Sequence, residues 1–249
     1  MKSNNPFAVH NINYLSPSSM NTFVADKPLW MMRYLFGIKS SSGAGAVRGI
    51  AEEYALAEKY ENGFFDFKAL DSKFISLCCE LSVDLNDGRT LKEKDALKGF
   101  GNVLDENFKY DNLETYQERI EVEVEDLPVP VIGYVDFLFK DKIVDLKTTN
   151  RMPSNPTEAQ KRQMAVYSMA YPKKSVDLFF ASSKNHKIFT LSSLTKYKKQ
   201  IKDIAFTIQR FLSLSDDKHE LASFEYPNFD KWEWSEDMKK EAKKIWSIK

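Results

Sequence analysis

Three charged residues, Asp136, Asp145 and Lys147, stand within two short apolar segments in the middle of the chain, at 133–139 and 142–149. The composition of both segments is typical of β-strands joined by a tight polar turn. Because the side chains of a strand alternate between two faces, Asp145 and Lys147 point to one face of a sheet, and Asp136 on the preceding strand can lie beside them. Ionised groups are costly to bury unless they are paired or hold a metal ion. The spacing therefore indicates a hydrolytic site for a hard metal ion.

Phosphodiester hydrolysis is the chemistry that these side chains suit. The reaction needs a polarised phosphoryl oxygen, an activated water molecule and stabilisation of the departing oxygen, and Mg²⁺ held by one or two carboxylates supplies all three. We expect Asp136 and Asp145 to be the carboxylate ligands, with the backbone carbonyl of Leu146 as a neutral ligand. Lys147 is expected to stabilise the phosphate charge or to orient the attacking water. The alternative is an exposed Asp145–Lys147 salt bridge on an edge strand with Asp136 incidental, but the apolar residues around the charges favour the metal site.

The elements that must position this site follow from the periodicity of the apolar residues. Alternating residues at 120–124 predict a half-exposed strand, and strands near 131–139 and 142–148 follow it. The expected fold class is α/β, with a mixed central sheet flanked by helices and helical additions at both ends. Further strands are predicted at 176–181 and 187–191, and helices at 20–24, 28–36, 46–61, 66–82, 90–109, 155–171 and 193–214, before a short lysine-rich helix at the C-terminus.

The length of 249 residues suits one large domain or a domain with an appended lobe. Three regions are expected: an N-terminal helical segment at 1–45, a core at 46–192 and a C-terminal helical extension at 193–249. Within the core, residues 46–115 are expected to be helical, and residues 116–192 are expected to form the sheet and the site.

The composition limits the possible partners and compartments. Lysine plus arginine number 36 and aspartate plus glutamate number 36, so the net charge is zero and a nucleic-acid groove must depend on local clusters of basic residues. The two cysteines, Cys78 and Cys79, are adjacent and indicate buried thiols in a reducing compartment. The chain has no apolar run of the roughly 20 residues that span a membrane, and its first residues lack the apolar stretch of a signal peptide. We therefore expect a soluble, cytoplasmic protein without a membrane partner.

No nucleotide cofactor is expected either. The sequence lacks a Gly-Lys-Ser/Thr phosphate loop, and the glycines at 43–49 follow a polar linker where a dinucleotide-binding turn would follow a strand.

Three motifs occur in order along the chain: Gly-x-x-Asp at 133–136, Asp-x-Lys-Thr at 145–148 and Gln-x-x-x-Tyr at 163–167. Together they resemble the RecB-type branch of the PD-(D/E)XK nucleases. The resemblance covers roughly residues 45–192 and includes the order of elements, a helix, three strands, a helix and a strand. It implies a restriction-endonuclease-like core, a Mg²⁺- or Mn²⁺-dependent deoxyribonuclease activity, and DNA as the partner.

The resemblance also implies roles for Gln163 and Tyr167. Four residues apart, they are neighbours on one face of a helix, which must lie over the sheet to bury its apolar residues. The amide and the phenol are then expected to hydrogen-bond a DNA phosphate or the catalytic lysine, Lys147. The alternative is that Tyr167 belongs to the core and Gln163 only caps its edge.

A further metal ligand is implied on the preceding helix, where the family often has His in a Gly-x-x-x-His pattern. The segment that begins at Gly49 has Glu53 at that position, and glutamate is a suitable Mg²⁺ ligand. Glu52 is the rival, but Arg48 can pair with Glu52 at four-residue spacing and leave Glu53 freer. None of the three histidines is expected to be a ligand, because they fall in the N-terminal tail, a turn and a polar loop: His10, His186 and His219.

Many RecB-type relatives hold an iron–sulfur cluster with one cysteine near the N-terminus and three near the C-terminus. The corresponding regions, 23–30 and 226–234, contain no cysteine, so no cluster is expected. Trp30, Trp232 and Trp234 are expected to join the two ends through apolar contacts instead.

DNA contacts are expected from the helix that carries the third motif and from basic residues near it, although such charge runs are more often solvated helix faces. The candidates are Thr148, Gln163, Tyr167, Lys196 and Lys199. The function expected is that of a metal-dependent DNA exonuclease in phage or bacterial recombination or DNA degradation, with a recombination or single-strand-binding protein as a possible partner and an oligomer as a possible assembly. The alternatives are a structure- or sequence-specific endonuclease on the same core and a catalytically silent DNA-binding or assembly subunit.

Overall fold

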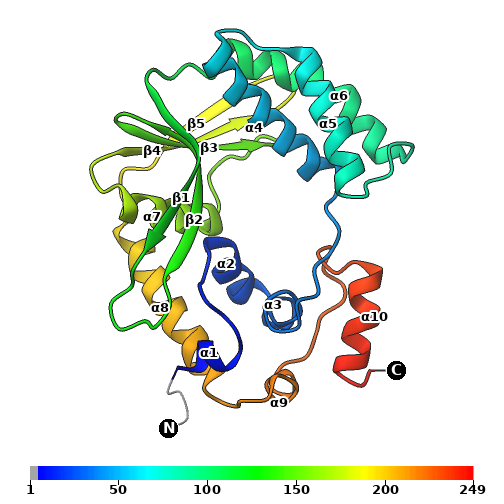
Figure 1. Cartoon of the computed structure of the whole chain (residues 1–249), viewed down its shortest axis with the longest axis vertical. Helices are drawn as coiled ribbons and strands as arrows, with labels where there is room; N and C mark the ends of the chain where they lie inside the picture. The colour runs from blue at the N-terminus through cyan, green and yellow to red at the C-terminus, as the bar shows by residue number, and fades with distance from the viewer. Residues whose placement is uncertain (1–4, 249) are drawn as a thin grey trace.

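The computed structural model describes residues 5–248, and residues 1–4, which begin the segment considered for a signal peptide, lie outside them. A five-stranded mixed sheet lies between two groups of helices (Figure 1). The strand order is β1-β2-β3-β4-β5, with β3 and β4 parallel and the other neighbours antiparallel. The strands are β1 (Leu113–Val122), β2 (Val131–Phe139), β3 (Lys142–Thr148), β4 (Ser175–Ala181) and β5 (His186–Thr190).

The helices divide between the two faces of the sheet. On one face, α4 (Ala44–Asn62), α5 (Phe67–Glu80) and α6 (Gly88–Asn107) share a core with Phe137 and Phe179. On the other face, α7 (Glu158–Ala170) and α8 (Thr195–Leu212) pack with the N-terminal helices. The remaining helices are α1 (Pro6–Val9), α2 (Pro17–Ala25), α3 (Lys27–Tyr34), α9 (Lys218–Ser223) and α10 (Glu236–Ile245).

The central strands are buried on both faces, which explains their sequences. In β3, Ile143 belongs to the core under α7 and α8, and Val144 belongs to the core under α4, α5 and α6. In β4, Leu178 and Phe179 divide between the two cores in the same way. Such strands contain continuous apolar residues, because a parallel pair is covered by helices on both sides. Asp145 is therefore a charged residue in the buried central part of β3.

The helix that carries the third motif begins at a well-defined cap. Thr157 accepts a hydrogen bond from the backbone amide of Gln160, and the Gln160 side chain accepts one from the Thr157 amide, which makes a capping box. The helix α7 connects β3 to the parallel strand β4, as parallel neighbours require a crossover. Residues 163 and 167 are thereby held over the carboxyl-terminal half of β3.

Most predicted elements are present, with differences in bounds or type at three places. The strand predicted at 120–124 is present as β1 but begins earlier, at Leu113, and ends earlier, at Val122; its first part was missed because the alternation of its side chains is reversed at Gln117, a residue with φ of 54°. His186 opens β5 and stacks on Phe179, where a turn was predicted. His219 lies in α9, where a polar loop was predicted.

The two ends of the chain meet through one of the predicted tryptophans. Trp234 is 3% exposed, packs with Leu29 and Met32 of α3, and donates from Nε1 to Asp26 Oδ2 at 3.2 Å. Trp30 is also buried, but it lies in the main core. The third member of the predicted set does not contribute, since Trp232 is 88% exposed. Among the described helices, none combines the length and the apolar composition of a membrane span.

Candidate active site

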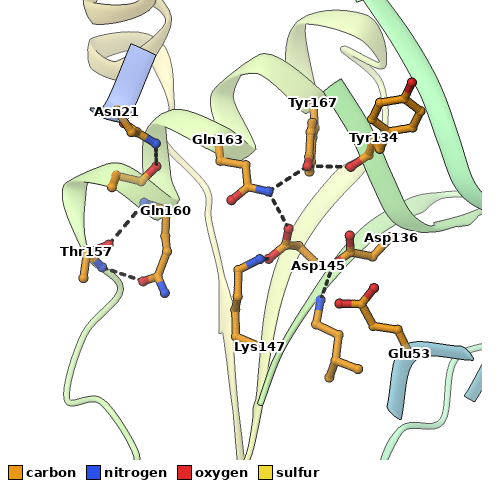
Figure 2. Close-up of polar contacts among 12 residues, drawn as sticks. Asn21, Glu53, Tyr134, Asp136, Asp145, Lys147, Thr157, Gln160, Gln163 and Tyr167 are labelled. Atoms are coloured by element: carbon orange, nitrogen blue, oxygen red, sulfur yellow. Dashed lines mark hydrogen bonds and ion pairs between the residues drawn. The ribbon is translucent and has the colours of Figure 1, made fainter. Parts of the chain in front are cut away.

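The charged residues predicted from the sequence converge where β2 and β3 part. The two strands pair only at Phe137 with Val144 and at Leu138 with Ile143. Beyond these pairs, the backbone amide of Leu146 donates to Asp136 Oδ2 at 3.0 Å, so a carboxylate takes the place of the neighbouring strand. Figure 2 shows Asp136, Asp145 and Lys147 at this opening, with Glu53 approaching from α4 and Gln163 from α7.

Asp145 is fully buried and is contacted from two sides. Its Oδ1 accepts a hydrogen bond from Gln163 Nε2 at 3.0 Å. Its Oδ2 lies 2.7 Å from Lys147 Nζ in an ion pair, but no hydrogen-bond donor among the described residues is aligned with this oxygen. The Asp145–Lys147 salt bridge of the alternative interpretation is thus present, but it lies in the central strand β3 and not on an exposed edge strand. A buried carboxylate oxygen with an unfilled coordination position is what a metal ligand requires.

The lysine stays charged in this setting. Burial lowers the pKa of Lys147, but the carboxylates of Asp145, Asp136 and Glu53 outweigh that effect and raise the pKa above its ordinary value. Lys147 is therefore a fixed positive charge across the whole physiological range of pH.

The carboxylates repel one another. Burial raises the pKa of Asp136 well above its usual range, and the neighbouring Asp145 adds to the shift. Burial also raises the pKa of Glu53 to about 7, Lys147 opposes the shift, and Asp145 reinforces it. One lysine does not neutralise three acids, so the donor set fits a divalent cation with a preference for oxygen ligands. Within residues 5–248 no group of three or more His, Cys, Asp and Glu side chains is arranged to hold a metal ion by itself, so an ion bound between these acids would need water molecules as further ligands.

The two candidate glutamates of α4 have different environments. Glu52 is fully buried, and its Oε1 forms an ion pair with Arg48 Nη1 at 3.1 Å. Arg48 also forms an ion pair with Glu93 and lies over the ring of Phe100. Glu53 accepts a hydrogen bond from Gln117 Nε2 at 3.1 Å and is close enough to Lys147 and Asp145 to interact with both electrostatically. Glu52 thus belongs to a structural ion-pair network, and Glu53 belongs to the cluster at the sheet opening.

Gln163 and Tyr167 form a hydrogen-bond network with Asp145, and their predicted contact with a DNA phosphate stays a prediction. The Gln163 amide donates to Asp145 and to Tyr167 Oη at 2.7 Å, and the Tyr167 hydroxyl donates to the carbonyl of Tyr134 at 2.6 Å (Figure 2). The predicted contact with Lys147 is absent from the described structure, because Asp145 occupies the space between the amide and the lysine chain. Tyr167 is 2% exposed, so it is at once a core residue and part of the polar network.

The glycine of the first motif is explained by this helix. A Cβ on Gly133 would lie 3.0 Å from Cε1 of Tyr167, closer than ordinary van der Waals contact. Glycine at this position lets α7 approach β2 and brings Gln163 within reach of Asp145.

An open cleft of about 700 Å³ leads to the site. Two basic residues that were not predicted from the sequence, Arg33 and Lys39, line it together with the segment 11–19. Arg33 lies in α3 and Lys39 in the segment that follows it, so both reach the cleft through the packing of the N-terminal helices, and no local motif marks them. The predicted lysines are elsewhere: Lys196 and Lys199 are exposed on α8, outside the cleft lining, and Lys196 pairs with Glu158 at 3.5 Å.

The side chain of Thr148, a predicted DNA contact, does not line the cleft either. Its hydroxyl lies against Glu52, whose pKa burial raises to about 7 while Arg48 and the Thr148 hydroxyl oppose the rise, and a Cβ on Gly49 would lie 3.4 Å from that hydroxyl. Thr148 therefore contacts α4 rather than the cleft.

The comparisons with known proteins agree with the class of protein that this fold and site define. A family model described as the PD-(D/E)XK nuclease superfamily matches residues 14–245, and the chain belongs to this superfamily. Its structure is similar to that of a protein from Eubacterium rectale named "putative exonuclease", with a TM-score of 0.60 and 14% identity over 96% of this chain and 92% of that one. At this identity the similarity shows the fold alone.

A second solved structure, that of SSO0001, matches with a TM-score of 0.33 and 15% identity over 76% of this chain and 86% of that one, which is too distant to support an argument. No curated protein matches the sequence. The superfamily expected from the three motifs is confirmed, and membership of the RecB-type branch stays a prediction.

Proposed function

We propose that the protein is a divalent-metal-dependent deoxyribonuclease that degrades DNA from an end, in recombination or DNA degradation in the cytoplasm of a bacterium or a phage-infected cell. The observation that carries the proposal is the convergence of Glu53, Asp136, Asp145 and Lys147 at the opening between β2 and β3. Three acids and one lysine beside an open cleft match the needs of phosphodiester hydrolysis.

Glu53, Asp136 and Asp145 would hold Mg²⁺ or Mn²⁺. The Leu146 carbonyl is the proposed neutral ligand, since its amide points to Asp136 and the amide and carbonyl of one strand residue lie on the same side. A bound ion of this kind polarises a phosphoryl oxygen and lowers the pKa of a bound water molecule.

The chain's own residues supply charge and orientation. Lys147, held protonated by its acidic neighbours, stabilises the negative charge that develops on the phosphate. Gln163 fixes the rotation of the Asp145 carboxylate through its bond to Oδ1. Tyr167 in turn fixes the Gln163 amide, because its own hydroxyl is committed to the Tyr134 carbonyl.

The substrate would lie in the cleft. Arg33 and Lys39 line it, and neither forms an ion pair within the described part of the chain. The rings of Tyr14 and Tyr134, each 53% exposed, border the same space and can stack on bases. Among the described residues that line the cleft, Asp136 is the single acid and Arg33 and Lys39 are basic. The electrostatic potential of the cleft therefore favours a polyanion.

The proposed attack from a DNA end is supported by a structural similarity. The similar protein from Eubacterium rectale carries the name "putative exonuclease", and this likeness favours exonuclease over endonuclease activity for the chain. A recombination or single-strand-binding partner protein and an oligomeric assembly fit such a role.

Linear and covalently closed DNA of the same sequence, incubated with Mg²⁺, Mn²⁺ or EDTA, test the proposal. We expect linear DNA to be degraded with either metal, closed circles to stay intact and EDTA to stop the reaction. Cleavage of closed circles would support an endonuclease on the same core. If the wild-type protein cuts neither substrate with any divalent metal, the protein is a catalytically silent subunit.

A further inference from the structure

Gln117 has a backbone conformation that is uncommon for its residue type. Its φ is 54° in the middle of β1, in the left-handed region that disfavours residues with a Cβ. Strained backbone of this kind persists where the surrounding structure determines it, and it is enriched at functional sites.

The left-handed residue reverses the faces of β1. Ile120 packs in the core under α7 and α8, so strict alternation would turn Tyr116 to the same core. Tyr116 packs instead on the other face, with its ring 5.3 Å from that of Phe137. The change of face falls between residues 116 and 118, at Gln117.

The neighbouring strand changes face at the matching position. Tyr116 pairs with Phe137, and Glu118 pairs with Val135, so Asp136 lies directly across from Gln117. Val135 faces the α7 core and Phe137 the α4 core, although two residues apart in a regular strand share one face. The β1–β2 ribbon therefore twists over at the Gln117–Asp136 pair, and this twist places both residues at the active-site opening.

The Gln117 side chain uses that position. Its Nε2 donates to Glu53 Oε2 at 3.1 Å, and the residue lines the cleft together with Asp136. A glutamate on a helix has a mobile side chain, and a hydrogen bond to one carboxylate oxygen restricts it while the other oxygen stays available. The amide is the neutral donor that can do this without adding a charge among three acids.

We propose that Gln117 is a positioning residue that orients Glu53 for the divalent cation. The proposal rests on the proposed function, because it supposes that Glu53 is a metal ligand. The structural alternative is that the left-handed residue only shapes the sheet and that its amide has no effect on the metal site.

Two substitutions separate the backbone from the amide. Gln117→Gly and Gln117→Asn both keep access to the left-handed conformation, since glycine lacks a Cβ and asparagine tolerates it. Both variants lose the contact with Glu53, because glycine has no side-chain amide and the side chain of asparagine is one methylene shorter than that of glutamine. We expect both variants to melt in EDTA within a few degrees of the wild type and to bind Mn²⁺ about tenfold more weakly by calorimetry.

The same change made in a Glu53→Gln background shows whether Glu53 carries the effect. We expect Gln117→Gly to weaken Mn²⁺ binding in the wild type but not in Glu53→Gln, because the partner is already lost. Unchanged affinity in both single variants, or an equal loss in both backgrounds, overturns the positioning role alone. If the wild type binds no Mn²⁺, the proposed metal site fails as well, and the two failures are thereby distinguished.

Discussion

Lys147 and the acids around it determine the electrostatics of the site. The lysine remains protonated because its neighbours are acidic, and the acids are destabilised because one lysine cannot neutralise them all. A site of this kind holds repulsion that a cation relieves. The stability of the protein should therefore depend on metal and on pH in a linked way.

Glu53→Gln is expected to raise the melting temperature in EDTA at pH 8. The pKa of Glu53 is about 7 in the folded protein against an ordinary 4.5. Between these values the folded protein retains a proton that the unfolded chain has released, so the contribution to the free energy of unfolding falls as the pH rises from 4.5 through 7. The glutamine variant avoids this loss, which we expect to amount to a few degrees of melting temperature.

Melting curves of both proteins from pH 4 to 8 check this expectation. The difference should be small near pH 4, should grow towards pH 8 and should shrink or change sign when Mg²⁺ is added, because the wild type gains from binding the ion. Glu61→Gln, an exposed position at the end of the same helix, is the control and should show no such trend. A difference that is independent of pH would argue against the burial of Glu53 in an acidic cluster.

Among the secondary-structure elements, α7 contacts the Asp145 carboxylate through Gln163 only because the helix lies close to β2. Gly133→Ala should push the helix away, since the new Cβ would lie 3.0 Å from the Tyr167 ring and 3.4 Å from Ile120 Cγ1. We expect a loss of about 1–3 kcal/mol in the free energy of unfolding and a lower cleavage rate, because Gln163 moves away from Asp145. Urea denaturation and an initial-rate assay measure the two effects.

Gly88→Ala is the matched control for that change. A Cβ on Gly88 meets nothing within 4 Å, so stability and activity should stay close to those of the wild type. Equal effects of the two substitutions would show that neither stability nor the cleavage rate depends on the close approach of α7 to β2.

The sequence predicted the elements whose pattern is local. The strand β3 was recognisable because both of its faces are buried, and α7 was recognisable from the helix start at 155–158 and the proline at 172. The start of β1 was not recognisable, because the reversal at Gln117 removes the alternation that marks a strand. The short helices α1 and α9 have too few residues to show a period.

For the site, too, the sequence predicted the residues that local spacing brings together and missed the others. Asp136, Asp145 and Lys147 come from adjacent strands, so spacing alone brings them together. Gln117 and Arg33 reach the cleft through a left-handed residue and through the packing of a distant helix, neither of which leaves a periodic signal.

At the scale of the whole molecule, the C-terminal segment stabilises the N-terminal helices that form one wall of the cleft. Trp234→Ala should lower the free energy of unfolding by about 3–5 kcal/mol, since it removes a buried indole from Leu29 and Met32 and its hydrogen bond to Asp26. Trp232→Ala should have almost no effect, because that side chain is 88% exposed. Urea denaturation of both variants checks the contrast, and equal losses would mean that Trp234 does not join the two ends.

The proposed course of DNA along the cleft predicts which basic residues contribute to binding. Arg33→Ala and Lys39→Ala should each weaken the binding of DNA in the presence of Ca²⁺. Each should also reduce the slope of log affinity against log salt concentration by about one, the value for one lost phosphate contact. Lys196→Ala and Lys199→Ala are the controls, since neither residue lines the cleft. Fluorescence anisotropy from 50 to 200 mM salt, a range over which such contacts are strongly screened, separates the two pairs. A larger effect at the α8 pair would place the DNA outside the cleft.

We propose that the cluster at the β2–β3 opening hydrolyses DNA, and the Lys147→Ala variant is the strictest test of this activity. Under single-turnover conditions with Mg²⁺ and end-labelled linear DNA, we expect the cleavage rate to fall by about 10²–10³-fold, because the charge that stabilises the developing phosphate negative charge is lost. Lys140→Ala, an exposed lysine at the turn between the same two strands, should cut at the wild-type rate. A folded Lys147→Ala protein that cleaves as fast as the wild type would show that DNA is not hydrolysed at this cluster.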